Sequence, residues 1–214
     1  MHARRASKLG PVPSIYSLKP KFQQLLRPMV RALQHAGVTA NQVTLLACAM
    51  SVAAGVAVAA HADSPRWLLI LPGLLFVRMA LNAVDGMLAR EFGQKTDLGA
   101  YLNELTDVVS DAFVYLPFAY LKPFDPLWVG AVILLAVISE MAGVLGVTVG
   151  GERRYEGPMG KSDRAFVFGA MALWMGLDGA VADWVGWVFP RLIVVLLACT
   201  IVNRIKNGLA ARRN

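Results

Sequence analysis

Between Asn82 and Asp111 the chain places carboxylates, amides and arginine inside two stretches that are otherwise apolar. An ionisable group at bilayer depth is disfavoured by at least about 2.5 kcal/mol on insertion scales, so several such groups in one segment indicate a functional site. The alternative is a hydrogen-bond network that only fixes helix packing. We favour a functional site because packing alone rarely needs three acidic groups beside Arg90.

Helical spacing predicts that these polar side chains converge. Asn82 and Asp85 lie about 4.5 Å apart along a helix and about 60° apart around it. Asn103, Asp107 and Asp111 are four residues apart, so each is displaced from the last by about 6 Å and about 40°. The short connection makes the two helices antiparallel neighbours, and four small residues leave room between them: Gly86, Ala89, Gly99 and Ala100. We expect a water-accessible pocket where the two polar stripes meet.

Arg78 lies two turns further into the membrane than Asp85. Its position leaves two interpretations open: an ion pair with Glu140 or another buried acid, or a contact with a lipid head group. We assign no role in the site to Glu140, Asp178 and Asp183, because each is an isolated acid in the sequence.

The elements that must position the polar cluster are membrane helices. Of 214 residues, 57% are hydrophobic and 16% are charged, and the mean hydropathy is +0.53. These values indicate an all-α, polytopic membrane protein, and we treat residues 1–214 as one membrane domain. A span needs about 20 apolar residues. Six segments qualify: 42–60, 67–89, 99–121, 127–149, 164–181 and 188–203.

The junction of the last two segments is the least regular part of this bundle, which covers residues 42–203. Five residues obscure it: Asp178, Gly179, Asp183, Gly186 and Pro190. A five-helix bundle is therefore an alternative to six transmembrane helices.

The basic residues indicate how the helices are oriented. Most of the 21 Lys and Arg residues precede residue 41 or fall within 90–95, 153–164 and 204–213, which share one side of a six-helix bundle. By the positive-inside rule, both termini and the pocket face the cytoplasm of a bacterial-type inner (plasma) membrane. The net charge of +7 suits anionic lipid head groups, and we see no reason to predict nucleic-acid binding.

Residues 18–36 are predicted to form an amphipathic helix before the first span. Apolar residues recur on one helical face with basic residues between them: Phe22, Leu25, Leu26, Met29 and Leu33, with Lys21, Arg27 and Arg31. Such a helix suits the cytoplasmic membrane interface, and a short helix packed on the loops is the alternative. Thr39 or Asn41 can cap the next helix.

The polar cluster also carries a resemblance to a known family. The pattern DGxxAR, eight residues, G, and D eight positions later is formed by Asp85, Gly86, Ala89, Arg90, Gly99 and Asp107. It resembles the signature of the CDP-alcohol phosphatidyltransferase family, which lies on the second and third of six transmembrane helices. The start of the first span, with Asn41 and Thr44, is similar to that family as well.

The resemblance implies an enzyme of phospholipid biosynthesis. Members of the family transfer a substituted phosphate group from a CDP-linked alcohol to a hydroxyl group and release CMP. We therefore expect CDP-diacylglycerol or a related CDP-lipid as donor, a hydroxyl acceptor that could be phosphorylated, and one or two Mg²⁺ or Mn²⁺ ions. The resemblance also implies a homodimer.

Two of the four family aspartates, which hold the metal ions, are replaced in this chain. Asp85 and Asp107 keep the carboxylate, whereas Asn82 and Asn103 offer a neutral amide oxygen, which attracts a hard dication more weakly. Asp111 is the best-placed substitute ligand. The resemblance makes Asp107 the expected catalytic residue, as general base toward the acceptor hydroxyl.

Further site residues follow from the same resemblance. Those expected to bind the CDP group are Asn41, Thr44, Asn82, Asp85, Gly86, Ala89, Arg90 and Gly99. The basic segment before the fifth span is a candidate for binding the acceptor or its phosphate, through Arg153, Arg154, Lys161 and Arg164. An ordinary positive-inside loop explains that segment equally well.

Two other functions stay open at this point. A degenerate family member would bind a CDP-lipid or metal without turnover, which the amides at Asn82 and Asn103 would fit. A small membrane transporter would use the buried acids as ion sites, but the sequence shows neither inverted repeats nor interrupted helices.

Overall fold

The computed structural model describes residues 15–211, with side chains for residues 20–210. Within this range the chain forms seven α-helices, two short 3₁₀ helices and no strand, which confirms the all-α prediction. They are α1 (Ile15–His35), α2 (Ala40–Ala60), η1 (Pro65–Leu69), α3 (Ile70–Glu91), α4 (Asp97–Tyr115), η2 (Leu116–Tyr120), α5 (Pro126–Thr148), α6 (Lys161–Asp178) and α7 (Asp183–Ala211). The basic residues predicted before residue 15 and at 212–213 lie outside the described range.

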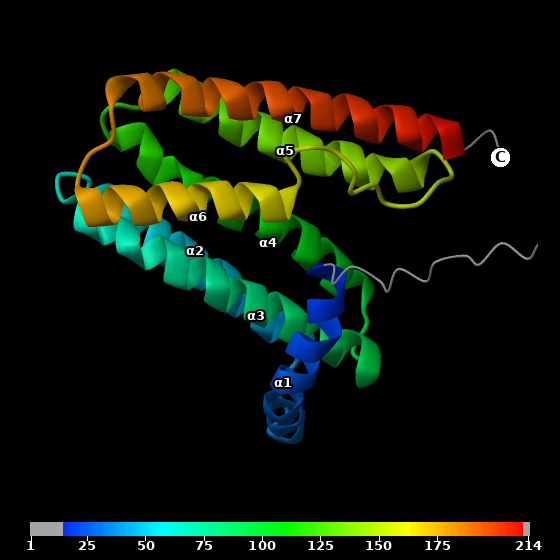
Figure 1. Ribbon diagram of the computed structural model, residues 1–214. Coiled ribbons are helices and arrows are strands. Elements are labelled where there is room, and N and C mark those ends of the chain that lie inside the picture. The colour runs from blue at the N-terminus through cyan, green and yellow to red at the C-terminus, as the bar shows by residue number, and fades with distance from the viewer. Residues whose placement is uncertain (1–14, 212–214) are drawn as a thin grey trace, which may run out of the picture.

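Helices α2 to α7 form an elongated bundle, and α1 lies across one end of it (Figure 1). The same end carries the α3–α4 connection, the α5–α6 loop and the C-terminal end of α7. Helix α2 packs against both α3 and α4, and α5 packs against α7. The polar ends of α3 and α4 therefore meet at the end of the bundle that α1 crosses.

Four helical segments are long and apolar enough to cross a membrane, which supports a membrane protein. They are Ala40–Ala60, Pro65–Glu91, Pro126–Thr148 and Asp183–Ala210, and they match four of the six predicted spans. Helices α4 and α6 fall outside this set because each carries four ionisable residues: Asp97, Glu104, Asp107 and Asp111 on α4, and Lys161, Asp163, Arg164 and Asp178 on α6. Asp111 on α4 and Arg164 on α6 are buried, so both of these less apolar helices supply a charged group to the bundle interior.

Helices α6 and α7 are separate, as the six-helix prediction requires, and the number of membrane spans stays a prediction. Helix α6 ends at Asp178, and Gly179 follows with a φ of +81°, in the left-handed region that favours glycine. Helix α7 begins at Asp183 and continues through Gly186 and Pro190. The last helix is therefore longer at both ends than the predicted 188–203.

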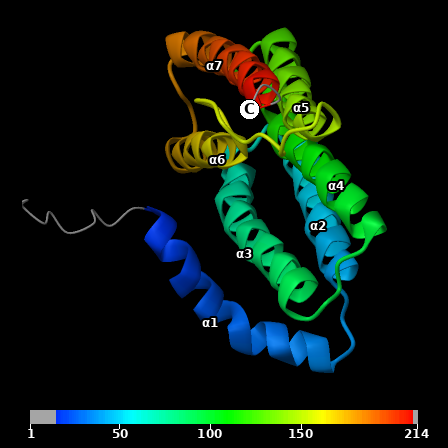
Figure 2. The same ribbon diagram turned by 90° about the vertical axis from the view of Figure 1, so that its right-hand side faces the viewer.

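Helix α1 lies outside the bundle formed by α2 to α7 (Figure 2), and it packs against α3 with one face only. Val30 is fully buried and lies with Leu26 and Leu33 against apolar residues of α2 and α3. Leu25 and Met29, by contrast, are 75% and 43% exposed. Part of the predicted apolar stripe of this helix therefore packs against α2 and α3, and part is exposed at the surface of the protein.

The opposite half of the bundle has an aromatic core. Tyr115 stacks on Phe168, and Phe118, Phe124 and Phe189 meet neighbouring rings edge-on at centroid distances between 5.1 and 5.9 Å. Edge-to-face contacts are favourable arrangements of aromatic rings. The buried charged groups therefore lie in the other half of the bundle, which α1 crosses.

Candidate active site

A pocket of about 710 Å³ opens where α2, α3, α4, the end of α5 and the α5–α6 loop meet. Most of the residues predicted to bind CDP or metal line it: Asn41, Thr44, Asp85, Gly86, Ala89, Arg90, Gly99 and Asn103. Lys95, Glu104 and Arg153 line it as well. Asn82 and Asp107 are half-buried and are not among the residues that line the pocket.

Helix α2 positions Asp85. The Thr44 hydroxyl lies 2.8 Å from Asp85 Oδ2 and donates a hydrogen bond to it. Thr39, rather than Asn41, caps α2: its hydroxyl accepts the N–H of Gln42, whose side chain accepts the N–H of Thr39. The start of the first span thus fixes the orientation of a carboxylate on the second.

The α3–α4 connection is fixed to the same end of α2. Gln94 Oε1 accepts the N–H of Ala40 at 2.7 Å, and Thr96 caps α4 by accepting the N–H of Gly99. A Cβ atom at Gly99 would lie 2.8 Å from Asn41 Oδ1, closer than carbon and oxygen pack. A larger residue at this position would require the Asn41 side chain to turn away from the start of α4.

Asp107 is held between two cations. Its Oδ2 lies 2.5 Å from Lys161 Nζ on α6, and its Oδ1 lies 3.4 Å from Arg78 Nη2 on α3. The Arg78 guanidinium also donates to the Asp107 carbonyl at 3.1 Å. Lys161, predicted as an acceptor-binding residue, thus lies at the carboxylate that was predicted to be catalytic.

Asp111 is surrounded by arginines rather than exposed to the pocket. Arg78 Nη1 lies 2.6 Å from its Oδ1 and Arg164 Nη2 lies 2.9 Å from its Oδ2. The partner of Arg78 is therefore a buried acid, which is one of the two interpretations left open by the sequence, although that acid is not Glu140. The predicted metal-binding role of Asp111 stays a prediction, and its two pairs give it a structural role of its own.

The α5–α6 loop is fixed by backbone contacts on both sides. The N–H of Arg154 donates to the carbonyl of Gly143 on α5 at 3.0 Å, and the N–H of Met159 donates to the Thr200 hydroxyl on α7 at 3.0 Å. These bonds place Arg153 at the pocket, where its guanidinium lies 2.6 Å from Glu104 Oε2.

Arg154 pairs locally with the ionised Glu156 at 3.3 Å. Burial acts to raise the pKa of Glu156, but backbone N–H donors, including that of Tyr155, and Arg154 outweigh it and hold that pKa below its usual range. Arg164, which was predicted to face the acceptor, is fully buried on α6 instead. The predicted roles of the four basic residues toward an acceptor stay predictions.

Glu140 has partners that the sequence did not reveal. Its carboxylate lies 2.9 Å from Arg164, 3.3 Å from Arg153 and 3.4 Å from Arg204. The prediction that Glu140 is an isolated acid was wrong, because a lone acid on an apolar helix can be paired by residues of other segments. One signal was present: Glu140 is the only ionisable residue of α5, and a charge in a membrane span needs a partner.

The donor set fits a divalent cation through hard oxygen ligands. In residues 15–211 no three His, Cys, Asp or Glu side chains gather into a metal-binding group. Asp85 and Asn103 nevertheless both face the pocket, and carboxylate, amide and substrate oxygens are the ligands that Mg²⁺ takes in proteins. The pocket therefore fits an ion whose coordination a substrate completes.

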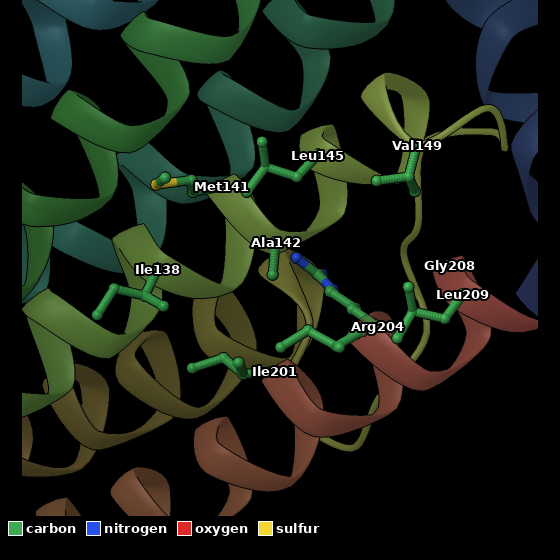
Figure 3. Close-up of a pocket in the computed structure, with 11 residues that line it drawn as sticks. Ile138, Met141, Ala142, Leu145, Val149, Ile201, Arg204, Gly208 and Leu209 are labelled. Carbon is green, nitrogen blue, oxygen red and sulfur yellow. The ribbon is translucent and has the colours of Figure 1, made fainter.

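A second pocket, of about 230 Å³, lies between α5 and α7 (Figure 3). Its lining is apolar except for Arg204, and it includes Ile138, Ala142 and Ile201. Figure 3 shows the Arg204 side chain extending from α7 toward α5, with its guanidinium near Ala142. This pocket offers an apolar surface but no set of groups for catalysis.

Comparison with known proteins identifies the family. The family model for CDP-alcohol phosphatidyltransferases matches residues 37–204 of this chain. This range includes every residue that lines the larger pocket. The chain belongs to the CDP-alcohol phosphatidyltransferase family. It is therefore an enzyme of the class that transfers substituted phosphate groups. This assignment favours the transferase over the transporter.

Two relatives of this CDP-alcohol phosphatidyltransferase are similar over much of their length. The inner membrane protein YnbA of Escherichia coli is 44% identical over 199 residues, which cover 92% of this chain and 96% of the relative. The archaetidylinositol phosphate synthase of Aeropyrum pernix is 31% identical over 152 residues, covering 64% of this chain and 77% of the relative.

Solved structures share the fold. The Mycobacterium tuberculosis phosphatidylinositol phosphate synthase with CDP-DAG bound has a TM-score of 0.69 at 22% identity, over 86% of this chain and 94% of that one. The same synthase in complex with manganese and citrate has a TM-score of 0.67 at 23% identity, over 85% and 88%. These similarities show that the chain shares the helical fold of that synthase.

Proposed function

We propose that this protein transfers a substituted phosphate group from a CDP-activated lipid, such as CDP-diacylglycerol, to a hydroxyl acceptor and releases CMP. The observation that carries the proposal is the single pocket in which Asp85, Gly86, Arg90, Gly99 and Asn103 meet at the α3–α4 end. The relatives named as archaetidylinositol phosphate synthase and phosphatidylinositol phosphate synthase support the same reaction type.

The donor would bind along the signature helices. Arg90 and Lys95 at the pocket can neutralise the pyrophosphate, and Gly86 and Gly99 leave the backbone open to it. Thr44 holds the carboxylate of Asp85 toward the donor. The binding-only alternative has no observation of its own behind it.

The family's divalent ion would be held by Asp85 and Asp107 with the amide oxygens of Asn82 and Asn103. When bound, it supplies positive charge against the pyrophosphate and the leaving CMP. The manganese in a structural relative supports metal use in this fold. We propose one or two such ions.

Asp107 would accept the proton of the acceptor hydroxyl. The acceptor oxygen then bonds to the phosphorus that carries the lipid, while the bond from that phosphorus to CMP breaks. In the described structure Lys161 covers Asp107 Oδ2, and the Lys161 side chain is about one-third exposed, so it can turn toward solvent and release that oxygen. Once Lys161 has turned away, the Asp107 carboxylate is available as the base.

The same proposal includes the membrane arrangement. We infer six spans, with α4 and α6 turning their buried charged groups, Asp111 and Arg164, toward the other helices of the bundle. The pocket end and both termini would face the cytoplasm of a bacterial-type inner membrane, with α1 at the interface through Leu25 and Met29. Residues 1–214 would form one membrane domain, and two copies would form a homodimer.

The decisive experiment compares wild type with Asp107→Asn in detergent or liposomes. Wild type should release CMP from CDP-diacylglycerol in the presence of Mg²⁺ or Mn²⁺ and a hydroxyl acceptor. Because a general base contributes about 10²–10⁴-fold, Asp107→Asn should lower kcat by that factor and leave the Kd for CDP-diacylglycerol within about tenfold.

The matched control is Asp178→Asn. It makes the same change from carboxylate to amide at an exposed residue, at the C-terminal end of α6. It should retain wild-type turnover. A wild-type protein that binds CDP-lipids but releases no CMP with any hydroxyl acceptor would instead be a binding-only member of the family. Lipid extraction after expression with labelled precursors would identify the product.

A further inference from the structure

Three arginines from three different segments converge on the buried carboxylate of Glu140. Arg164 comes from α6, Arg153 from the α5–α6 loop and Arg204 from α7. Figure 3 shows Arg204 reaching toward α5 from the neighbouring helix. Guanidinium groups that converge from several elements are a common way to bind a phosphate. Here they surround an anion that belongs to the chain itself.

The ion pairs around Glu140 continue without a break to the proposed base. Arg153 links Glu140 to Glu104, and Arg164 links it to Asp111. From Asp111 the pairs continue through Arg78 to Asp107 and Lys161. The connected set has five cations, Arg78, Arg153, Lys161, Arg164 and Arg204, and four carboxylates, Glu104, Asp107, Asp111 and Glu140.

This set has little positive charge left for another anion. A phosphate monoester carries about −1.5 to −2 charges at pH 7. Near these arginines it would meet Glu140 and Glu104, and repulsion between like charges is strong where water is scarce. The arginines around Glu140 are therefore already paired with carboxylates of the chain.

Two members of this set, Glu104 and Arg153, face the pocket from which an acceptor would arrive. Glu104 lines the pocket one helical turn before Asp107 on α4, and its partner Arg153 lines the pocket beside it. An acceptor approaching Asp107 along this wall meets a paired acid and base rather than a free basic surface. Such a wall suits hydroxyl groups that donate and accept hydrogen bonds.

We infer that Glu140 fills the anion-binding position of the acceptor region, and that the acceptor is an alcohol without a phosphate group. This inference rests on the proposed transferase function and names the substrate class of its second site. Glu140 acts through the arginines it neutralises, so it is a specificity-determining residue rather than a catalytic one. Its effect is to exclude phosphorylated acceptors by charge.

The first test needs only the wild-type protein. CMP release from CDP-diacylglycerol is measured with matched acceptor pairs, glycerol against glycerol 3-phosphate and inositol against inositol 1-phosphate. The unphosphorylated member of an active pair should have at least a tenfold higher kcat/KM. A higher kcat/KM for the phosphorylated member of any pair would overturn the inference.

The second test measures binding and does not depend on turnover. Isothermal titration with inorganic phosphate compares wild type, Glu140→Gln and the control Glu152→Gln, whose side chain is exposed in the α5–α6 loop. Glu140→Gln keeps the shape of the side chain and frees one positive charge, so it should bind phosphate at least tenfold more tightly than the other two. Equal binding by all three proteins would refute the inference.

The two tests separate this inference from the proposed function. If no acceptor yields CMP, the transferase proposal fails, and the phosphate titration still decides the role of Glu140. If Glu140→Gln does not fold, the comparison of phosphorylated and unphosphorylated acceptors with the wild-type protein still tests the inference. A gain of turnover with glycerol 3-phosphate in Glu140→Gln, absent from Glu152→Gln, would support both.

Discussion

The four signature positions at the pocket end differ in charge and in surroundings. Asp85 is a buried carboxylate oriented by Thr44, whereas Asn103 offers an amide to the same pocket. Asp107 is held by Lys161 and Arg78. Lys161 and Arg78 therefore supply part of the positive charge that a metal ion would supply next to Asp107. The amides reduce the negative charge available to hold a dication.

Restoring both acids, Asn82→Asp with Asn103→Asp, should strengthen metal binding. Two added carboxylates raise the attraction for a hard dication, so the Kd for Mn²⁺ should fall at least tenfold in a calorimetric titration. The control is Asn203→Asp with Asn207→Asp, which adds two carboxylates at exposed positions of α7. Equal Mn²⁺ affinity in both double variants would show that the signature amides do not limit metal binding.

The secondary-structure elements of the cytoplasmic half, as we orient it, are joined by ion pairs rather than by apolar packing alone. Asp111 on α4 joins α3 through Arg78 and α6 through Arg164. Helices α3 and α6 pack against each other, while α4 reaches them through this carboxylate. Breaking such a buried pair leaves charges without a partner in a medium of low polarity.

Asp111→Ala should therefore destabilise the bundle. Removing one partner of a buried ion pair costs about 3–5 kcal/mol, so the thermal unfolding temperature in detergent should fall by several degrees. Asp63→Ala, at an exposed position in the α2–α3 connection, should leave that temperature unchanged. A fall of the same size in both variants, or in neither, would contradict a stabilising role for Asp111.

The whole molecule has two unlike ends. One end holds the pocket, the charged network and α1, and the other holds the aromatic core (Figure 1). With its active site at one end, the proposed transferase would take up a water-soluble acceptor and release water-soluble CMP on that side. From the distribution of basic residues we proposed that this side faces the cytoplasm.

Cysteine labelling would test this orientation. In a background with Cys48→Ala and Cys199→Ala, a membrane-impermeant maleimide should label Asp63→Cys from outside spheroplasts. Glu152→Cys, in the α5–α6 loop, should be labelled only after the cells are opened, because that loop belongs to the pocket end. Labelling of Glu152→Cys in intact spheroplasts would reverse the proposed orientation.

Much of this protein is determined locally and could be predicted from its sequence. Helix periodicity and apolar length gave the all-α class, the extents of most helices and the convergence of Asp85, Gly86 and Gly99 on one pocket, because helical spacing fixes which residues share a face. The separation of α6 from α7 depended on Gly179, whose left-handed conformation only the structure showed.

The charge partners were decided by tertiary structure alone. Glu140, Arg153 and Arg204 are distant in sequence, and nothing in helical spacing says which acid on one helix meets which arginine on another. Lys161 reached Asp107, and Arg164 turned into the core, because α6 packs beside α3 and its N-terminal end lies against α4. The sequence determined that charged groups had to be paired within the membrane, and only the packing of the helices decided with which partner.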